Sequence, residues 1–414
     1  MIKFYRFSLE NGLRVLVHED KSSPLVAMNI LYDVGSRDEN PESTGLAHLF
    51  EHLMFGGTSA IPDYDKPLQL AGGENNAFTN SDITDYYLTV PETNIETGFW
   101  LESDRMSGLD FSHKNLETQK SVVIEEFYQR YLNQPYGDAM LLLKPMAYKI
   151  HPYRWMTIGR DISHVENVNL DEVKDFFYSH YAPNNAILTL TGNISPDRAF
   201  MLANKWFSTV SKRMIKPRKL PEEPVQNEER RMTVERDVPA TALYKGWHIG
   251  KRDSKDYYVL DLITDLLAGG ESGRLYTKLV REKKLFSEIN AYLTSDIDPG
   301  MVILYGRLMK GIDIQYAEES VNKILSNLKE RYPAEKEMEK VKNKFESSTI
   351  LSNTNILNKA MNISFYELLG NPDLINNEVD EYKKTDRKMV AEVSQKFLIP
   401  TNCSTLYYIS TRKD

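Results

Sequence analysis

Three polar side chains interrupt an otherwise apolar segment of the chain, residues 46–55. His48, Glu51 and His52 have the spacing H-x-x-E-H. In an α-helix, residues three or four positions apart lie on the same face, so these two imidazoles and the carboxylate would lie together. Neutral imidazoles are good zinc ligands, and a carboxylate beside the metal can hold a water molecule. The spacing therefore indicates a metal centre that activates water.

The apolar neighbours of these residues favour that interpretation. A helix that is apolar on every side is usually buried. Imidazole and carboxylate groups left unpaired in a buried site would cost several kcal/mol, and a bound metal ion would remove this cost. The alternative is that His48 and His52 are core histidines hydrogen-bonded to backbone groups, with Glu51 partly exposed.

A catalytic zinc site also needs a third protein ligand and an open position for water. The periodicity of residues 114–132 predicts a helix whose apolar face includes Val123. At 100° per residue, Glu126 lies about 60° from Val123 and borders the core, whereas Glu125 lies about 160° away and points to solvent. Gln119 lies on nearly the same line as Glu126 and could support it through a hydrogen bond. The alternative for Glu126 is a surface acid on an amphipathic helix.

The elements that must position these residues follow from periodicity and turn signals. Asn11-Gly12 between two alternating segments predicts a β-hairpin. Strands that first meet as hairpins, with helices following, indicate an α+β fold rather than a doubly wound sheet. We expect strands at 4–9, 14–18, 25–34, 85–90 and 186–191, and helices near 44–55, 93–106, 114–132, 170–180 and 196–208.

A repeated pattern predicts two domains. VGSRD at 34–38 recurs as IGKRD at 249–253, and the glycine pair at 56–57 recurs at 269–270, which indicates a duplication. Three prolines among charges, without periodicity, predict a linker between the copies. We expect two homologous domains, each a mainly antiparallel sheet with helices packed on it: a catalytic zinc-binding domain at 1–213, a linker at 214–228 and a degenerate domain at 229–414.

The second copy lacks the metal motif. At an offset of 213 residues, Asp261, Thr264 and Asp265 take the places of His48, Glu51 and His52. This set has no imidazole and no organised base. We therefore expect one active half and one supporting half.

Composition narrows the classes of partner and compartment. The formal net charge of −8 gives no support to a nucleic-acid partner. One cysteine, Cys403, allows no intrachain disulfide. No apolar stretch is long enough for a membrane span, and no signal peptide is visible. We expect a cytoplasmic protein, or a periplasmic one if a precursor segment has been removed.

Three segments resemble one peptidase family. GLAHLFEHLMFGGT (45–58), GGENNAFTNSDITDYYLTVP (72–91) and VVIEEF (122–127) are similar to the inverted-motif zinc peptidases that include pitrilysin, insulin-degrading enzyme and mitochondrial processing peptidase. The second domain is similar more weakly, and the chain resembles a half-length, bacterial-type member. The 74 residues that separate His52 from Glu126 are close to the family spacing.

The resemblance implies a role for each motif residue. His48, His52 and Glu126 would bind Zn²⁺. Glu51 would be the general base that takes a proton from the attacking water and passes it to the leaving amine.

It also implies that an extended substrate adds a strand to the first domain's sheet, beside Asn76, Ala77 and Phe78. Without the resemblance, these three residues would be an ordinary edge strand or loop.

Two departures from the family pattern stand out. Gln119 occupies a position where family members often carry an acid, so metal affinity would be weaker. The later domain of the family supplies an Arg and, seven residues on, a Tyr, both of which bind substrate. Here Arg281 is followed at that distance by Glu288, with Phe286 as the nearest aromatic residue. The alternative for Arg281 is a surface charge on a helix.

These features predict a zinc-dependent endopeptidase that acts on unfolded peptides inside a chamber formed by several domains. The absent Tyr suggests a homodimer, or a heterodimer with a related chain that supplies the Arg and Tyr half. The alternatives are a non-catalytic structural or assembly subunit of a peptidase-like complex and a protein that stores or senses zinc.

Overall fold

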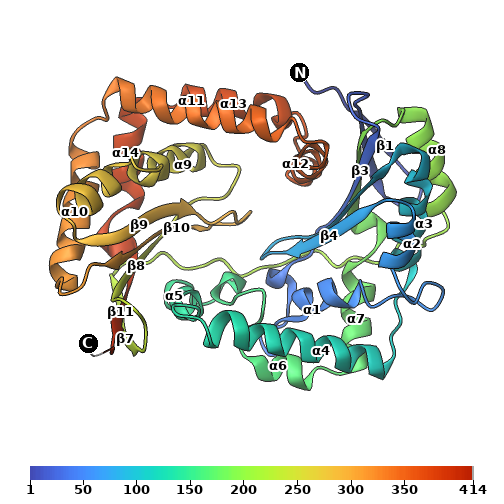
Figure 1. Ribbon diagram of the computed structural model, residues 1–414, viewed down its shortest axis with the longest axis horizontal. Helices are drawn as coiled ribbons and strands as arrows, with labels where there is room; N and C mark the ends of the chain where they lie inside the picture. The colour runs from blue at the N-terminus through green and yellow to red at the C-terminus, as the bar shows by residue number, and fades with distance from the viewer. Residues whose placement is uncertain (413–414) are drawn as a thin grey trace. The chain divides into compact units, whose positions relative to one another are not determined.

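A computed structural model describes residues 1–412. The chain forms two compact units, each built around one β-sheet (Figure 1). The first unit comprises Met1–Tyr128, Trp155–Leu220 and Ile350–Asn377. The second unit comprises Gln129–Arg154, Pro221–Thr349 and the residues from Glu378 on. Each helix within residues 1–412 is too short or too polar to span a lipid bilayer.

The first sheet has six strands in the order β1-β2-β6-β3-β5-β4. Only β2 and β6 pair in parallel, so the predicted antiparallel character is confirmed. The predicted hairpin around Asn11-Gly12 is also confirmed, because Tyr5 of β1 pairs with Val17 of β2. The strands are β1 (Tyr5–Ser8), β2 (Arg14–Glu19), β3 (Leu25–Tyr32), β4 (Glu74–Thr79), β5 (Thr84–Pro91) and β6 (Ala186–Gly192).

Helices cover both faces of this sheet. Helices α3 (Ile95–Ser107) and α8 (Pro196–Phe207) lie on one side, and α12 (Ile356–Leu368) lies on the other (Figure 1). On the α12 side, Ser364 Oγ accepts a hydrogen bond from Asn29 Nδ2 at 3.0 Å and donates to Thr189 Oγ1 at 2.7 Å. With both faces covered, β3 and β6 are buried along nearly their whole length.

The second sheet has five strands in the order β7-β11-β8-β10-β9, and only β7 and β11 are parallel. Helices α9, α10 and α14 cover one face, and α5 covers the other. The elements are α5 (Ala139–Ala147), β7 (Arg230–Arg236), β8 (Ala242–His248), α9 (Lys255–Ala268), β9 (Phe286–Leu293), β10 (Met301–Leu308), α10 (Ile314–Glu330), α14 (Arg387–Phe397) and β11 (Cys403–Ser410).

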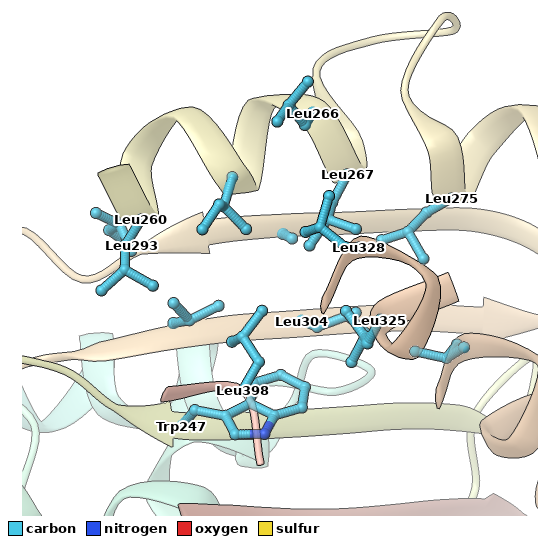
Figure 2. Close-up of a cluster of buried hydrophobic side chains, with 14 of the residues drawn as sticks. Trp247, Leu260, Leu266, Leu267, Leu275, Leu293, Leu304, Leu325, Leu328 and Leu398 are labelled. Atoms are coloured by element: carbon cyan, nitrogen blue, oxygen red, sulfur yellow. The ribbon is translucent and has the colours of Figure 1, made fainter. Parts of the chain in front are cut away.

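Leucine side chains fill the core between the second sheet and its helices. Figure 2 shows Trp247 of β8 and Leu304 of β10 beneath leucines of α9. Each fully buried leucine contributes roughly 1.5–3 kcal/mol relative to an exposed one, so this face is a main source of the unit's stability. The labelled leucines are Leu260, Leu266, Leu267, Leu275, Leu293, Leu304, Leu325, Leu328 and Leu398.

The two units do not divide the chain at a single linker. Helix α12 comes from the C-terminal half of the sequence and packs on the first sheet, whereas α5 comes from the N-terminal half and packs on the second. One face of each sheet is therefore covered by a helix from the opposite half of the sequence. Residues 214–228 contain no helix or strand, as expected of a linker. Whether the repeated sequences end at 213 and 229 stays a prediction.

The remaining helices complete the units. The helix predicted at 114–132 ends earlier as an α-helix and continues as a π-helical turn, η3. The helices are α1 (Leu46–Leu53), α2 (Asp65–Leu70), α4 (His113–Phe127), η3 (Tyr128–Leu132), α6 (Ile162–Asn167), α7 (Leu170–His180), the π-helix η6 (Tyr276–Glu282), α11 (Glu335–Ser352) and α13 (Leu374–Lys384).

Candidate metal centre

Helix α1 is amphipathic. One face is buried and consists of Leu46, Leu49, Phe50 and Leu53. His48, Glu51 and His52 lie on the opposite face. At a rotation of 100° per residue, their side chains point about half a turn away from the buried face. Their side chains are only half-buried. The expectation that α1 is buried on every side is therefore wrong for this face, which is the one a substrate would have to reach.

Aromatic packing fixes the orientation of α1. The Phe50 ring stacks on Phe176 of α7 and on Tyr181, with ring centroids 5.3 and 5.1 Å apart. Tyr86 Oη donates a hydrogen bond to the Phe50 carbonyl at 3.4 Å. Because the buried face is held in this way, the side chains on the opposite face have a defined direction.

The turn after α1 lies tightly against the start of α4. A Cβ atom at Gly56 would lie 2.5 Å from Asn115 Oδ1, so any larger residue at this position would displace the Asn115 side chain. Ser112 caps α4, because its side chain accepts a hydrogen bond from the Asn115 amide at 3.2 Å. This close approach sets the distance between the two helices that carry the predicted ligands.

Helix α4 brings Glu126 to the two histidines. Glu126 Oε2 lies 3.4 Å from His52 Nε2 and 3.7 Å from His48 Nε2. One ligand atom from each of the three residues lies within 4.8 Å of the other two. Glu125, one position earlier, is exposed on the outer side of the helix. Among residues 1–412, this is the group of three His, Cys, Asp or Glu side chains placed to hold a metal ion.

The donor set fits zinc. Two ligands bound at about 2.0–2.2 Å with tetrahedral geometry lie about 3.3–3.6 Å apart, close to the two separations from Glu126 Oε2. Two neutral imidazoles and one carboxylate are the composition of several catalytic zinc sites. The side chains of His48, His52 and Glu126 remain 12, 23 and 17% exposed, so a fourth position is open to water.

Glu51 lies next to this set without belonging to it. Burial raises the pKa of its carboxyl above the usual value, while Thr79 and His52 act in the opposite direction. A raised pKa brings a carboxyl closer to the range in which a general base works at neutral pH. Because Thr79 is the last residue of β4, the candidate base lies between the ligands and that strand.

Strand β4 carries the three residues predicted to bind substrate. It forms one edge of the first sheet and pairs only with β5. Asn76 is exposed, Phe78 is half-buried and Ala77 is buried. The Ala77 amide donates to Asn76 Oδ1 at 2.8 Å, so it uses an acceptor within its own strand.

The structure does not connect the other two predicted residues to the site. Gln119 is half-buried on α4, and its side chain makes no hydrogen bond with residues 1–412. Arg281 is exposed on η6 of the second unit. Near it, Phe286 is buried and Glu288 pairs with Arg307 at 3.0 Å. The roles of Gln119 and Arg281 stay predictions.

The second unit has an ion pair and hydrogen bonds at the positions equivalent to the ligands. Asp265 pairs with Lys344 Nζ at 2.6 Å, and Asp261 accepts a hydrogen bond from Tyr382 Oη at 2.6 Å. Thr264 Oγ1 donates to the Asp261 carbonyl at 2.8 Å. The Lys344 ammonium thus supplies the positive charge beside Asp265. Asp261 has the Tyr382 hydroxyl as its partner, so neither carboxylate needs a metal ion.

One buried residue that contacts the start of α1 is absent from the residues predicted from the sequence. Glu39 is 5% exposed, and its carboxylate accepts hydrogen bonds from the Gly45 amide at 3.0 Å and the Ala47 amide at 2.9 Å. Burial raises its pKa to about 8, and these two backbone hydrogen bonds act against that rise. No sequence signal identifies Glu39, because a helix cap is expected at the residue directly before the helix.

Comparisons with known proteins show which family the chain resembles. A profile of the family described as Insulinase (Peptidase family M16) matches residues 14–154, and one described as Peptidase M16 inactive domain matches residues 167–345. The zinc protease PqqE of Helicobacter pylori is 28% identical over 341 residues, covering 81% of this chain and 77% of that protein. The uncharacterized zinc protease YmxG of Bacillus subtilis is 27% identical over 357 residues, covering 85% and 84%.

Solved structures show the same two-domain fold. A protease from Helicobacter pylori has a TM-score of 0.93 and 25% identity, covering 99% of this chain and 100% of that one. A peptidase M16 inactive domain from Pseudomonas fluorescens has a TM-score of 0.89 and 19% identity, covering 100% and 99%. The periplasmic protease PqqL from Escherichia coli has a TM-score of 0.79 and 17% identity, and the match covers 48% of its length.

We expect zinc binding to depend on Glu126 and not on its neighbour. Glu126→Gln removes the charged ligand, so zinc affinity should fall at least about 100-fold. This loss exceeds the one expected when a residue that only hydrogen-bonds to a metal ligand is replaced. Glu125→Gln removes the same charge from an exposed position on the same helix and serves as the matched control. Metal analysis after dialysis against buffered zinc measures both variants. Stoichiometric zinc in Glu126→Gln would contradict the assignment.

Proposed function

Because the chain belongs to peptidase family M16, we propose that it is a zinc-dependent endopeptidase that hydrolyses peptide bonds of unfolded peptides. The observation that carries this proposal is the combination of a three-residue donor set with a separate carboxylate beside it. His48, His52 and Glu126 would hold the metal. Glu51 remains available for proton transfer.

The metal site and Glu51 would have different roles in peptide hydrolysis. Zinc, when bound, supplies a Lewis acid that polarises the scissile carbonyl and makes water easier to deprotonate. Glu51 takes a proton from the attacking water and delivers it to the leaving amine. Its partly buried carboxyl suits both steps, because a raised pKa makes the group a stronger base and still allows it to act as an acid after protonation.

The edge strand supports an extended substrate. A peptide that adds a strand beside β4 would form main-chain hydrogen bonds along Asn76, Ala77 and Phe78. Because Thr79 at the end of the same strand lies next to Glu51, the peptide would run towards the base. An unfolded segment has free main-chain groups along its whole length, which is why we propose unfolded peptides as the substrate class.

We also propose that a second chain completes the enzyme. The chain matches 48% of the length of PqqL and 45% of the length of pitrilysin, so those polypeptides are about twice as long as the part that this chain matches. A homodimer, or a heterodimer with a related chain, would supply an equivalent number of domains and could enclose a chamber. A related partner could also supply the Arg and Tyr pair, because Glu288 stands where the Tyr is expected.

A non-catalytic subunit is the second candidate. It is favoured by the inactive-domain description of the profile that matches residues 167–345 and of one structural relative. The donor set argues against it, because a subunit without catalysis has no need of three converging ligands and an adjacent carboxylate. An assembly subunit would show neither stoichiometric zinc nor peptidase activity.

Glu51→Gln tests the catalytic proposal. The amide keeps the shape of the side chain but cannot accept a proton, so we expect kcat for unstructured peptides to fall about 10²–10⁴-fold. Zinc content should stay at one ion per chain, because Glu51 is not a ligand. Cleavage assays on a peptide mixture, with chelator-treated protein alongside, provide the measurement. A variant as active as the parent chain would disprove the role of Glu51.

Ala77→Pro tests the edge strand. Proline has no N–H, so position 77 could no longer exchange its present bond to Asn76 Oδ1 for a main-chain hydrogen bond to a docked peptide. We expect KM to rise roughly 3–10-fold, since one such bond is worth about 0.5–1.5 kcal/mol. The control is Tyr5→Pro, at the first residue of β1 on the opposite edge of the same sheet. Equal KM values for the two variants would exclude β4 as the docking strand.

Chain concentration tests the partner proposal. If two chains form the enzyme, the peptidase rate per chain should rise with concentration in parallel with the dimer measured by sedimentation velocity. If the partner is a related chain, its addition should raise the rate at a fixed concentration of this chain. A fully active monomer would rule out this part of the proposal if its rate rises neither with chain concentration nor on addition of a related chain.

A further inference from the structure

Helix α1 begins without a cap of its own. The first N–H groups of any helix have no partner within the helix, and a side chain at the preceding residue usually accepts from them. Here that residue is Gly45, which has no side chain and adopts the left-handed conformation at φ = 92°. His48 stands only three residues later, so the disorder of an uncapped first turn would reach a metal ligand.

Glu39, six residues before Gly45 in the sequence, supplies the missing acceptors. Each of its two carboxylate oxygens accepts one backbone N–H, from Gly45 and from Ala47. Two hydrogen bonds to the two oxygens of one carboxyl group fix both the position and the rotation of the first turn. Ala47 directly precedes His48, so the constraint acts on the neighbouring peptide unit.

The segment that carries Glu39 is itself anchored. It follows the short 3₁₀-helix η1 (Ser36–Asp38). Arg37 is buried and pairs with Asp82 at 2.6 Å, in the turn between β4 and β5. Trp155 Nε1 donates to the Ser36 carbonyl at 3.0 Å. Glu39 therefore ties the start of α1 to the edge-strand hairpin through contacts within the first unit.

A second contact holds the residue before Gly45. Thr44 Oγ1 accepts a hydrogen bond from the Arg160 amide at 2.8 Å and lies 2.9 Å from His164 Nδ1. This contact does not involve Glu39. Loss of the Glu39 carboxylate would thus leave the chain attached at Thr44, so the first turn of α1 would shift while the fold persists.

We propose that Glu39 is a positioning residue that sets the zinc-binding geometry of His48 and His52 by holding the first turn of α1. The separations of 3.4 and 3.7 Å between Glu126 Oε2 and the two imidazoles match tetrahedral zinc, and a movement of α1 by a fraction of an ångström would spoil that match. The kinetic part of this inference rests on the proposed peptidase function, whereas its metal-binding part does not.

Two substitutions at Glu39 and one control provide the test. Glu39→Ala removes both acceptors, and Glu39→Gln keeps one of them. Ser195→Ala removes the cap of α8 in the same unit, where the Ser195 side chain accepts from the Arg198 amide at 3.3 Å. Zinc affinity is measured by competition with a chromogenic chelator, and the site geometry by the visible absorption spectrum of the Co²⁺-substituted protein.

We expect zinc affinity to fall about 10–100-fold in Glu39→Ala and less in Glu39→Gln, as for other residues that orient metal ligands. The Co²⁺ spectrum should change in both variants, and kcat should fall while KM stays close to that of the parent chain. Ser195→Ala should lower thermal stability and leave zinc affinity and spectrum unchanged.

A purely structural role for Glu39 would give the opposite result: lower thermal stability with parental zinc affinity and an unchanged Co²⁺ spectrum in both Glu39 variants. That outcome would overturn the inference. If the parent chain binds zinc but cleaves no peptide, the proposed function fails, while the order of zinc affinities among the variants still decides the role of Glu39.

Discussion

Two imidazoles and a carboxylate from two different helices can hold one zinc ion only if their ligand atoms lie within a few tenths of an ångström of a tetrahedral arrangement. This constraint explains the density of contacts around α1. The Phe50 ring fixes one face, Gly56 sets the approach to α4, and Glu39 holds the first turn. None of these residues is among the three candidate ligands, yet each restricts where an imidazole can lie.

The rest of the first unit supports the same requirement. Helices cover both faces of its sheet, so β3 and β6 are buried along nearly their whole length, while the edge at β4 keeps only one neighbouring strand. In the second unit the equivalent helix, α9, keeps its packing, but Asp265 pairs with Lys344. The duplication therefore preserved the fold in both halves and kept the metal-ligand chemistry in one.

Much of this arrangement could be predicted from the sequence, because its signals are local. Helical spacing grouped His48 with His52, the 100° rule distinguished Glu126 from Glu125, and Asn11-Gly12 marked a hairpin. The features that escaped prediction depend on distant contacts. No periodicity reveals that α12 covers the first sheet, since an apolar helix face does not specify its partner. Glu39 acts through backbone amides six and eight residues away, which no motif records.

The proposed function requires that His48, His52 and Glu126 bind one zinc ion beside Glu51, whose carboxyl is not a ligand. The most direct test is a crystal structure of the zinc-loaded protein with an anomalous difference map recorded on both sides of the zinc absorption edge. We expect one strong peak about 2.0–2.2 Å from the Nε2 atom of each histidine and from a Glu126 oxygen, with Glu51 outside bonding distance. A zinc peak at other residues, or Glu51 bound in place of Glu126, would contradict it.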